Sequence, residues 1–294
     1  MPSRYRRGVT VRIGPVVAAG WAGSPRAKGL AGLRPASDAA RVALFLRWRY
    51  ADREAPRNEG TCVMPVAIIT GASKGLGRAL AEALAARGWD LVLDARGIEA
   101  LTEAAGAVST RGTRVTALPG DVADAGHRSE LVAAAWKLGG VDLLVNNASA
   151  LGAEPLVRLE GLPLEGLRRA LEVNVVAALG LVQEALPQLR ASEAGTVITV
   201  SSDAAAEAYE TWGGYGASKA ALDHLAAVLG EEEPGLRVWA VDPGDMATDL
   251  YAAAVPDDED PRPEPVGVVP AFLRLLDERP ASGRYGAPAL LESR

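Results

Sequence analysis

Tyr215 and Lys219 are the two residues whose types and spacing most directly suggest chemistry. They lie four residues apart in the stretch YGASK, at the start of a predicted helix over 215–229, so both side chains can share one helix face. A free tyrosine has a pKa of about 10, and a neighbouring ammonium favours its phenolate. The pair can therefore give a proton to a carbonyl oxygen or take one from an alcohol. Because this spacing is also common in ordinary helices, the pair indicates catalysis only in a suitable setting.

A glycine-rich turn supplies part of that setting. The stretch TGASKGLG, residues 70–77, follows an apolar run and opens a helix-like segment over 77–88. Glycines after a buried strand let the backbone approach a ligand closely, and the following helix directs free N–H groups at it. The turn at Gly71, Gly75 and Gly77 therefore predicts a pyrophosphate site. Glycine in such turns is often only structural, and no P-loop lysine motif follows at the required spacing.

Strand-like and helix-like segments alternate from Met64 onward, which is typical of a parallel sheet built from βαβ units. Helices are predicted between the strands, notably at 165–190 and 215–229. The predicted fold class is α/β: a doubly wound parallel sheet of the Rossmann type, in three αβα layers, forming one domain over 64–294. Strands are predicted at 66–70, 90–96, 114–121, 141–148, 195–202, 236–244 and, as a short last strand, 283–288.

The residues after the second predicted strand bear on which dinucleotide would bind. Asp94 lies where an acidic residue could accept the ribose hydroxyl of NAD, but it comes one position early on a strand whose side chains alternate. Arg96 follows it, and Lys74 lies within the glycine turn. Two cations near the ribose suit a 2′-phosphate, so NADP is favoured and NAD stays possible. The alternative is that both cations are simply solvated.

Composition excludes some partners. Residues 1–63 carry 12 Lys or Arg against 4 Asp or Glu, whereas the remainder carries 19 against 33, and an acidic body repels nucleic acid. No apolar run reaches the roughly 18 residues that cross a bilayer. Cys62 is the only cysteine, which fits a reducing compartment, and we expect a cytoplasmic protein. His127 and His224 lack metal-ligand partners, so no metal is expected.

The basic segment 1–63 is expected to be a disordered extension, a targeting peptide, or sequence preceding a true start at Met64.

The motifs together resemble those of the short-chain dehydrogenase/reductase family over nearly all of residues 65–290. The family's TGxxxGxG pattern is matched at 70–77, its NNAG appears as NNAS at 146–149, and GDV ends at Val122. Ser202 precedes Tyr215 by thirteen residues, the spacing typical of the family, and DPGDMAT matches its PGxxxT segment. One departure is Ser149, which replaces the glycine of NNAG.

The resemblance implies a function, an NAD(P)-dependent oxidoreductase acting on alcohols or carbonyls, and it assigns site residues. Tyr215 would be the general acid or base, Ser202 would bind the substrate oxygen, and Lys219 would hold the nicotinamide ribose. Asn174 would connect Lys219 to solvent through a water. A small-molecule carbonyl or alcohol is the implied substrate, and a homodimer or homotetramer is the implied assembly. The implied cofactor-binding residues are Thr70, Gly71, Ser73, Lys74, Gly75, Leu76, Gly77, Arg96, Asp121, Val122, Asn147, Ala148, Lys219, Pro243, Gly244 and Thr248.

Some alternatives stay open. The segment 251–268, rich in proline and acidic residues, is either a surface loop or part of a substrate lid over about 245–268. Trp212 and Tyr209 either line the substrate pocket or pack. A dinucleotide-binding sensor or scaffold without turnover is the alternative function, and an extended-family epimerase or dehydratase is the alternative enzyme. The substrate and the direction of reaction cannot be deduced from these motifs.

Overall fold

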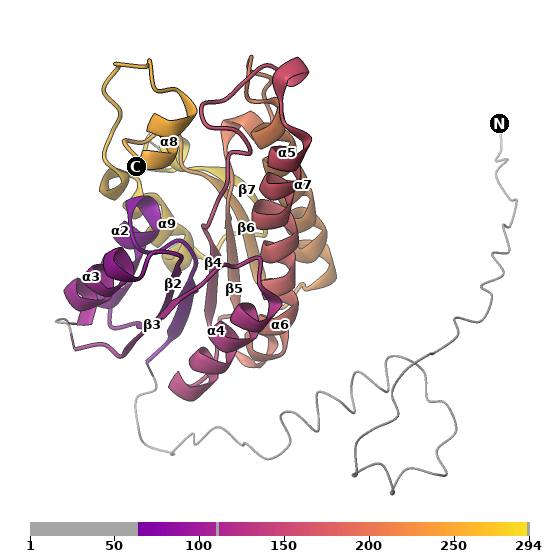
Figure 1. Cartoon of the computed structure of the whole chain (residues 1–294). Coiled ribbons are helices and arrows are strands. Elements are labelled where there is room, and N and C mark those ends of the chain that lie inside the picture. The colour runs from indigo at the N-terminus through magenta and orange to yellow at the C-terminus, as the bar shows by residue number, and fades with distance from the viewer. Residues whose placement is uncertain (1–63, 110–111, 293–294) are drawn as a thin grey trace, which may run out of the picture. The chain divides into compact units, whose positions relative to one another are not determined.

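The computed structural model describes residues 64–109 and 112–292, which belong to one compact unit. The expectations for residues 1–63 lie outside the described residues. A seven-stranded, all-parallel sheet runs through the centre of the unit, in the order β3-β2-β1-β4-β5-β6-β7 (Figure 1). The strands are β1 (Val66–Ile69), β2 (Asp90–Ala95), β3 (Val115–Pro119), β4 (Leu143–Asn146), β5 (Thr196–Val200), β6 (Arg237–Asp242) and β7 (Gly283–Gly286).

Helices cover both faces of the sheet, so the predicted three-layer, doubly wound α/β fold is confirmed (Figure 1). Because the chain crosses from one half of the sheet to the other after β3, the strand order reverses between the neighbouring strands β1 and β4, which is where such folds bind ligands. One face carries α2 (Gly75–Ala86), α3 (Ile98–Ser109), α9 (Val269–Glu278) and α10 (Ala287–Glu292). The other carries α4 (Ala125–Leu138), α6 (Ala178–Ala191) and α7 (Gly213–Glu232).

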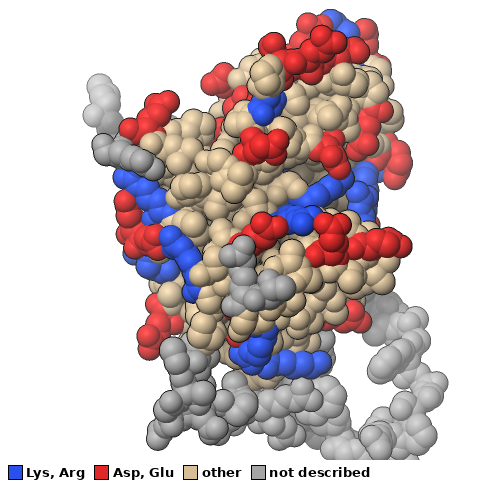
Figure 2. All heavy atoms as spheres, turned by 90° about the vertical axis from the view of Figure 1, so that its left-hand side faces the viewer, with Lys and Arg blue, Asp and Glu red and all other residues tan. Residues whose placement is uncertain are grey.

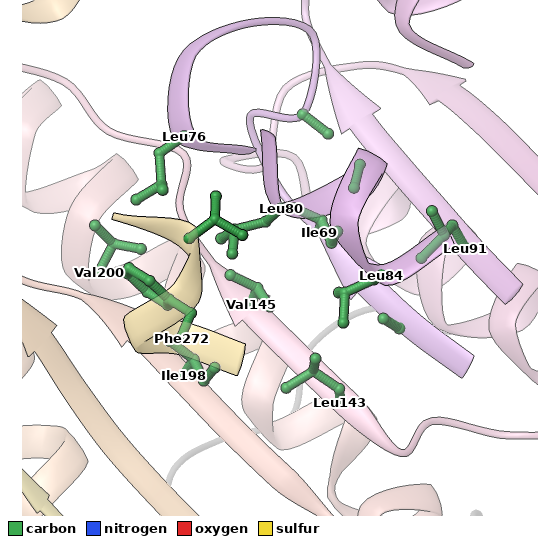
Figure 3. Close-up of a cluster of buried hydrophobic side chains, with 14 of the residues drawn as sticks. Ile69, Leu76, Leu80, Leu84, Leu91, Leu143, Val145, Ile198, Val200 and Phe272 are labelled. Atoms are coloured by element: carbon green, nitrogen blue, oxygen red, sulfur yellow. The ribbon is translucent and has the colours of Figure 1, made fainter. Parts of the chain in front are cut away.

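The core follows from the alternation of apolar side chains along the buried strands. In β1, Ala67 and Ile69 join the cluster under α2 and α9, whereas Val66 and Ile68 join the cluster under α4 and α6. Figure 3 shows the first cluster, in which side chains of α2 and α9 meet those of β1, β4 and β5. A strand buried on both faces needs this continuous apolar pattern, which is why the runs in the sequence located the sheet correctly.

The segment predicted as one helix over 165–190 is divided in the structure. It consists of α5 (Leu164–Leu171), one π-helical stretch (Glu172–Ala177) and α6. Among the described residues, the combined run 164–191 is the single helix long and apolar enough, by length and composition alone, to cross a membrane. Leu181, Val182 and Leu189 of α6 are buried in the core cluster against the sheet, so the apolar character of this run has a packing role here.

The proline-rich segment after β6 is also more ordered than the sequence indicated. It contains α8 (Asp249–Ala254) and a short 3-10 turn (Pro265–Gly267). Thr248 caps α8, since its side-chain oxygen accepts a hydrogen bond from the Tyr251 backbone N–H at 3.2 Å. Other 3-10 turns occur at Leu159–Gly161 and Asp203–Ala205. The loop over 255–264 stays irregular, as its prolines predict.

Candidate active site

A cavity of about 760 Å³ opens at the carboxyl ends of the strands. Segments that follow β1, β2, β3, β4, β5 and β6 line it, together with the start of α7 and α8. Most of the predicted site residues meet there although they are far apart in sequence. Those that line the cavity are Gly71, Ser73, Lys74, Gly75, Leu76, Arg96, Asp121, Val122, Asn147, Ala148, Ser202, Tyr215, Lys219, Pro243, Gly244 and Thr248.

The glycine turn at the start of α2 has the geometry of a phosphate cradle. Gly71 has φ of +64°, a conformation that side chains disfavour, and a Cβ there would lie 2.9 Å from Nδ2 of Asn147. A Cβ on Gly77 would collide with the carbonyl oxygen of Gly71. The turn therefore needs glycine to bring its backbone to the N-terminus of α2, and this bare backbone fits the pyrophosphate of a dinucleotide.

Three predicted site residues lie behind the lining rather than in it: Thr70, Gly77 and Asn174. Thr70 is buried, and its hydroxyl oxygen accepts hydrogen bonds from the backbone N–H groups of Asn147 and Ala148, both at 3.0 Å. Nδ2 of Asn147 in turn donates to the Thr70 carbonyl oxygen at 2.8 Å. These bonds join the ends of β1 and β4, so Thr70 shapes the cofactor cradle from beneath.

The Asp94 carboxylate is hydrogen bonded within the protein and is therefore not free to accept the ribose hydroxyl of NAD. Its carboxylate is 1% exposed, and Oδ1 lies 2.6 Å from Nε2 of His127 on α4. Desolvation by burial raises the pKa of Asp94, and the hydrogen bond to His127 opposes that rise. Although Asp94 borders the cavity, its carboxylate is already engaged, as the alternation along β2 predicts.

The cations at the same end of the cavity are more accessible. Arg96 is exposed and lines the cavity next to Gly97. Lys74 is also exposed, and its ammonium pairs with Asp249 at the start of α8. Arg169 of α5 pairs with Asp121 at 2.5 Å, and this partner helps to lower the pKa of Asp121 against the opposing effect of burial. The sequence analysis did not identify Arg169 as a site residue, because α5 and the segment after β3 come together only in the folded chain.

Tyr215 lies at the other end of the cavity and is 5% exposed. Burial raises its pKa well above the ordinary value, and the negative charges of Asp242 and Asp203 act in the same direction. Hydrogen bonds with the hydroxyls of Ser149 and Ser202 partly oppose this rise. The expectation that Lys219 lowers the tyrosine pKa is therefore outweighed here by desolvation. A phenol held neutral in this way is suited to donate its proton.

Lys219 lies deeper than a typical lysine, with 2% of its surface exposed. Its ammonium donates a hydrogen bond to the Val200 carbonyl oxygen at 2.8 Å and lies 5.4 Å from the centroid of the Tyr215 ring. Burial lowers the pKa of Lys219 from 10.5 to about 8, although the nearby Asp223 carboxylate favours the charged form. The position of one turn along α7 thus brings the lysine to the tyrosine, as the sequence spacing predicts.

Ser202 lies two residues after the end of β5 and, like Tyr215, borders the cavity. Its hydroxyl donates to Oδ1 of Asp203 at 3.0 Å and accepts from the Ala204 backbone N–H at 3.2 Å. Ser149, the departure from the family motif, donates to Oδ1 of Asn174 at 3.3 Å and hydrogen bonds with Tyr215. The serine therefore adds a hydroxyl group where the motif would have none.

Asn174 lies in the π-helical stretch and is 1% exposed. Its Oδ1 accepts from the Ala150 backbone N–H at 2.8 Å, and its Nδ2 donates to the Ala150 carbonyl at 2.9 Å and to Oγ of Ser218 at 2.8 Å. Inserted residues of this kind are frequent at functional sites because they re-aim a side chain. Here Asn174 joins the loop after β4 to α7, the helix that carries Tyr215.

Trp212 lines the cavity and packs edge-to-face against Tyr215, with ring centroids 5.6 Å apart. Tyr209 is exposed and hydrogen bonds to Asp203 and Glu207 instead. Across the cavity, Pro243, Gly244 and Thr248 follow β6 as the motif predicts. Among residues 64–109 and 112–292, no group of three or more His, Cys, Asp or Glu side chains is arranged to hold a metal ion.

Comparisons with known proteins identify the family of this chain. The family model described as short chain dehydrogenase matches residues 65–259. Glycine betaine reductase ATRR of Emericella nidulans is 35% identical over 198 residues, which are 66% of this chain and 15% of that protein. The 7alpha-hydroxysteroid dehydrogenase of Escherichia coli is 31% identical over 202 residues, 68% of this chain and 76% of that one.

A solved structure shares the fold. The alcohol dehydrogenase from the archaeon Thermococcus sibiricus, complexed with 5-hydroxy-NADP, matches with a TM-score of 0.69 and 28% identity, covering 76% of this chain and 95% of that one. The family model, the relatives and the fold point the same way. This chain belongs to the short-chain dehydrogenase family of oxidoreductases, whose cofactor is a nicotinamide dinucleotide.

Proposed function

We propose that this oxidoreductase reduces the carbonyl group of a small molecule to an alcohol, with NADPH as the preferred cofactor and Tyr215 as the general acid. One observation carries the proposal: Ser202, Tyr215 and Lys219 converge on a cavity whose opposite end is formed by a phosphate cradle. A protein that only binds or senses a dinucleotide has no need for a buried lysine beside a buried tyrosine. Burial of both groups costs folding free energy, and ionisable groups buried in this way are typical of functional sites.

The reacting atoms are positioned by this chain's own residues. Nicotinamide, when bound, supplies or accepts a hydride. In reduction, Oη of Tyr215 donates its proton to the substrate oxygen, while Ser202 turns its hydroxyl from Asp203 to hydrogen bond the same oxygen. The Lys219 ammonium stabilises the phenolate that remains, and Asn174 keeps the loop after β4 against α7. In oxidation the same groups act in reverse, with Tyr215 as the base.

The preference for NADPH is proposed from the charges near Arg96. The Asp94 carboxylate, which could have bound a ribose hydroxyl, is hydrogen bonded to His127. Arg96 and Lys74 line the same end of the cavity, and a guanidinium is well suited to bind a phosphate. The 2′-phosphate of NADP would meet two cations there, whereas NAD would gain little from them.

The first experiment is to titrate the full chain with NADPH and NADH separately, following nicotinamide fluorescence, and then to measure oxidation of the better cofactor by a panel of ketones and aldehydes. We expect tighter binding of NADPH and turnover of at least one carbonyl. The variant Y215F should bind the cofactor equally well and lose turnover. Binding without turnover by any carbonyl or alcohol would favour the sensor or scaffold alternative, and tighter NADH binding would contradict the role of Arg96.

Two further parts of the proposal concern assembly and access. Val176, Leu179 and Val228 are exposed apolar side chains on the π-helical stretch, α6 and α7, which supports pairing of two copies through these helices. The segment 245–268 borders the cavity through Met246, Leu250 and Tyr251, which supports its role as a substrate lid. Light scattering would measure the assembly, and proteolysis with and without NADPH would measure protection of the lid.

A further inference from the structure

Arg284 of β7 lies outside every motif named above, yet its guanidinium contacts three segments that carry the site. Nη2 donates to the Ser202 carbonyl oxygen at 2.9 Å and lies 3.3 Å from Oδ2 of Asp242. Nε donates to Oδ2 of Asp223 at 3.1 Å. A single side chain from the last strand thus bonds the segment just after β5, the end of β6 and the middle of α7.

Each partner of Arg284 is adjacent to a residue with a proposed function. Ser202 would bind the substrate oxygen, Asp242 immediately precedes the Pro243 and Gly244 pair, and Asp223 lies one helical turn after Lys219. Asp242 Oδ1 also accepts from the Gly244 backbone N–H at 3.0 Å, and Ser201 donates to Asp223 at 2.7 Å. The arginine is therefore at the centre of a network that surrounds the catalytic end of the cavity.

The burial of this network makes its bonds consequential. The side chains of Asp223 and Asp242 are each 15% exposed, and Arg284 is 38% exposed. Ion pairs that water reaches freely contribute little, but removing one partner from a largely buried carboxylate leaves an uncompensated charge. Oδ1 of Asp223 is buried and has no hydrogen-bond partner, so the side-chain hydrogen bonds of Asp223, from Arg284 and Ser201, are all made to Oδ2.

We propose that Arg284 is a positioning residue of the active site, which holds Ser202, the Pro243–Gly244 turn and the Lys219 turn of α7 in their reactive arrangement and sets the charge balance around Lys219. The inference rests on the proposed function of Tyr215 and Lys219. It adds to that function a residue on β7 that does not touch the reacting atoms. Its guanidinium acts through Ser202, Asp223 and Asp242.

The charges around Lys219 predict the direction in which its pKa should shift in each variant. Asp223 on the same helix favours the charged form of Lys219, while Asp242 of β6 and Asp203 after β5 act on Tyr215. Arg284 of β7 is the cation that compensates Asp223 and Asp242. Loss of the arginine should therefore raise the pKa of Lys219, and loss of the Asp223 charge should lower it further below its ordinary value. A purely structural role would not produce opposite shifts.

The test compares R284Q, R284K, D223N and the double variant R284Q/D223N in the full chain. Each is measured by steady-state carbonyl reduction across pH 6 to 10 and by NMR titration of ε-13C-labelled lysine, which reports the Lys219 charge without turnover. R284Q should lower kcat about 10- to 100-fold through misplacement and move the Lys219 titration up by about half a pH unit. D223N should move it down, and the double variant should return it close to the wild type.

R284K separates charge from geometry, because lysine keeps the charge but cannot form the forked set of bonds. It should restore the titration and leave kcat low. The matched control is R87Q: Arg87 is also 38% exposed and pairs with a carboxylate, Asp277, far from the cavity lining. R87Q should change neither kcat nor the Lys219 titration.

The outcomes distinguish this inference from the proposed function. If the wild type reduces no carbonyl, the proposed function fails, while the NMR titrations still test the charge balance. If the wild type turns over and R284Q matches it in both kcat and titration, the positioning role is refuted. The same holds if R87Q has an equal effect, or if R284Q and D223N shift the lysine in the same direction. Thermal unfolding of each variant identifies any that fail to fold, and R284K then provides the comparison.

Discussion

The two ends of the cavity are built on different physical terms. At the cofactor end, Arg96, Lys74 and Arg169 are accessible to water, and their partners, where they have them, are single carboxylates such as Asp249 and Asp121. At the catalytic end, Tyr215, Lys219 and Asn174 are nearly inaccessible, and each has at least one polar contact inside the protein. One cavity therefore has solvated charged groups at its cofactor end and desolvated polar groups at its catalytic end.

This difference separates two kinds of control. Exposed cations act through screened attractions of modest size, which suits a choice between cofactors that differ by one phosphate. Desolvation changes the pKa values of buried groups, which suits proton transfer but lowers the free energy of unfolding. Figure 2 shows charged side chains of both signs spread over one face, with acidic groups gathered at the top of the view, above the height of α8 in Figure 1.

The largest effect is expected at Tyr215. Removing the hydroxyl in Y215F eliminates the proton donor, and general acid catalysis is worth about 10²- to 10⁴-fold, so kcat should fall by that range while the NADPH dissociation constant stays unchanged. Stopped-flow single turnovers and fluorescence titration would measure the two quantities. An enzyme that retained more than a tenth of its kcat would show that another group supplies the proton.

The buried lysine should produce the next largest effect, and it acts on stability. With a pKa of about 8 in the folded chain and 10.5 when exposed, Lys219 loses its proton first in the folded state, so the unfolded state binds more protons between these values. The unfolding free energy of the wild type should therefore rise with pH across this window relative to K219M, by on the order of 3 kcal/mol.

Urea unfolding of wild type and K219M at pH 7 and pH 10.5 gives this difference directly. Packing changes caused by the substitution are the same at both pH values and cancel, as does the titration of all other groups. A wild type whose unfolding free energy runs parallel to that of K219M between pH 7 and pH 10.5 would mean that Lys219 keeps its ordinary pKa in the folded chain. K219M should also lose most carbonyl reduction.

The catalytic end shows what could and could not be predicted from sequence. Tyr215 and Lys219 lie on one helix, so their spacing alone brought them together, and Ser202 follows a strand whose apolar pattern is clear. The π-helical insertion at Asn174 leaves no mark on the apolar periodicity, so 165–190 was interpreted as one helix. Arg284 was not found because its role depends on β7 pairing with β6, in which Ala240 lies opposite it.

At the cofactor end, the informative signal in the sequence was the alternation of side chains along β2. The alternation along β2 indicated that the Asp94 carboxylate would not serve the ribose, and in the structure this carboxylate meets His127, although Asp94 also borders the cavity. No pattern indicated that His127, six residues after the end of the predicted strand 114–121, would be its partner. Local periodicity determines which side of a strand a residue faces, whereas its partner depends on how α4 packs against the sheet.

A smaller effect is expected at Arg96. The substitution R96Q should weaken NADPH binding about tenfold, as expected for the loss of one charged hydrogen bond to phosphate, and leave NADH binding unchanged. Fluorescence titrations with both cofactors at one ionic strength would measure the ratio. R87Q again serves as the control for a distant exposed arginine. Equal weakening of both cofactors would place Arg96 near a group that NADPH and NADH share.

The smallest effect is expected at the ion pair between Lys74 and Asp249, because both side chains are largely exposed. Asp249 competes with a bound phosphate for the ammonium, so D249N should tighten NADPH binding by about two- to threefold at low salt and by less at 0.5 M salt, where such attractions are screened. K74Q should abolish the salt-dependent part of that gain. Glu103, which pairs with Arg78 on α2, provides the matched exposed carboxylate, and E103Q should leave NADPH binding unchanged at both salt concentrations. If D249N instead weakens binding, Asp249 positions α8 at the cavity and does not compete for Lys74, and the exposed end would then resemble the catalytic end in relying on a carboxylate for geometry.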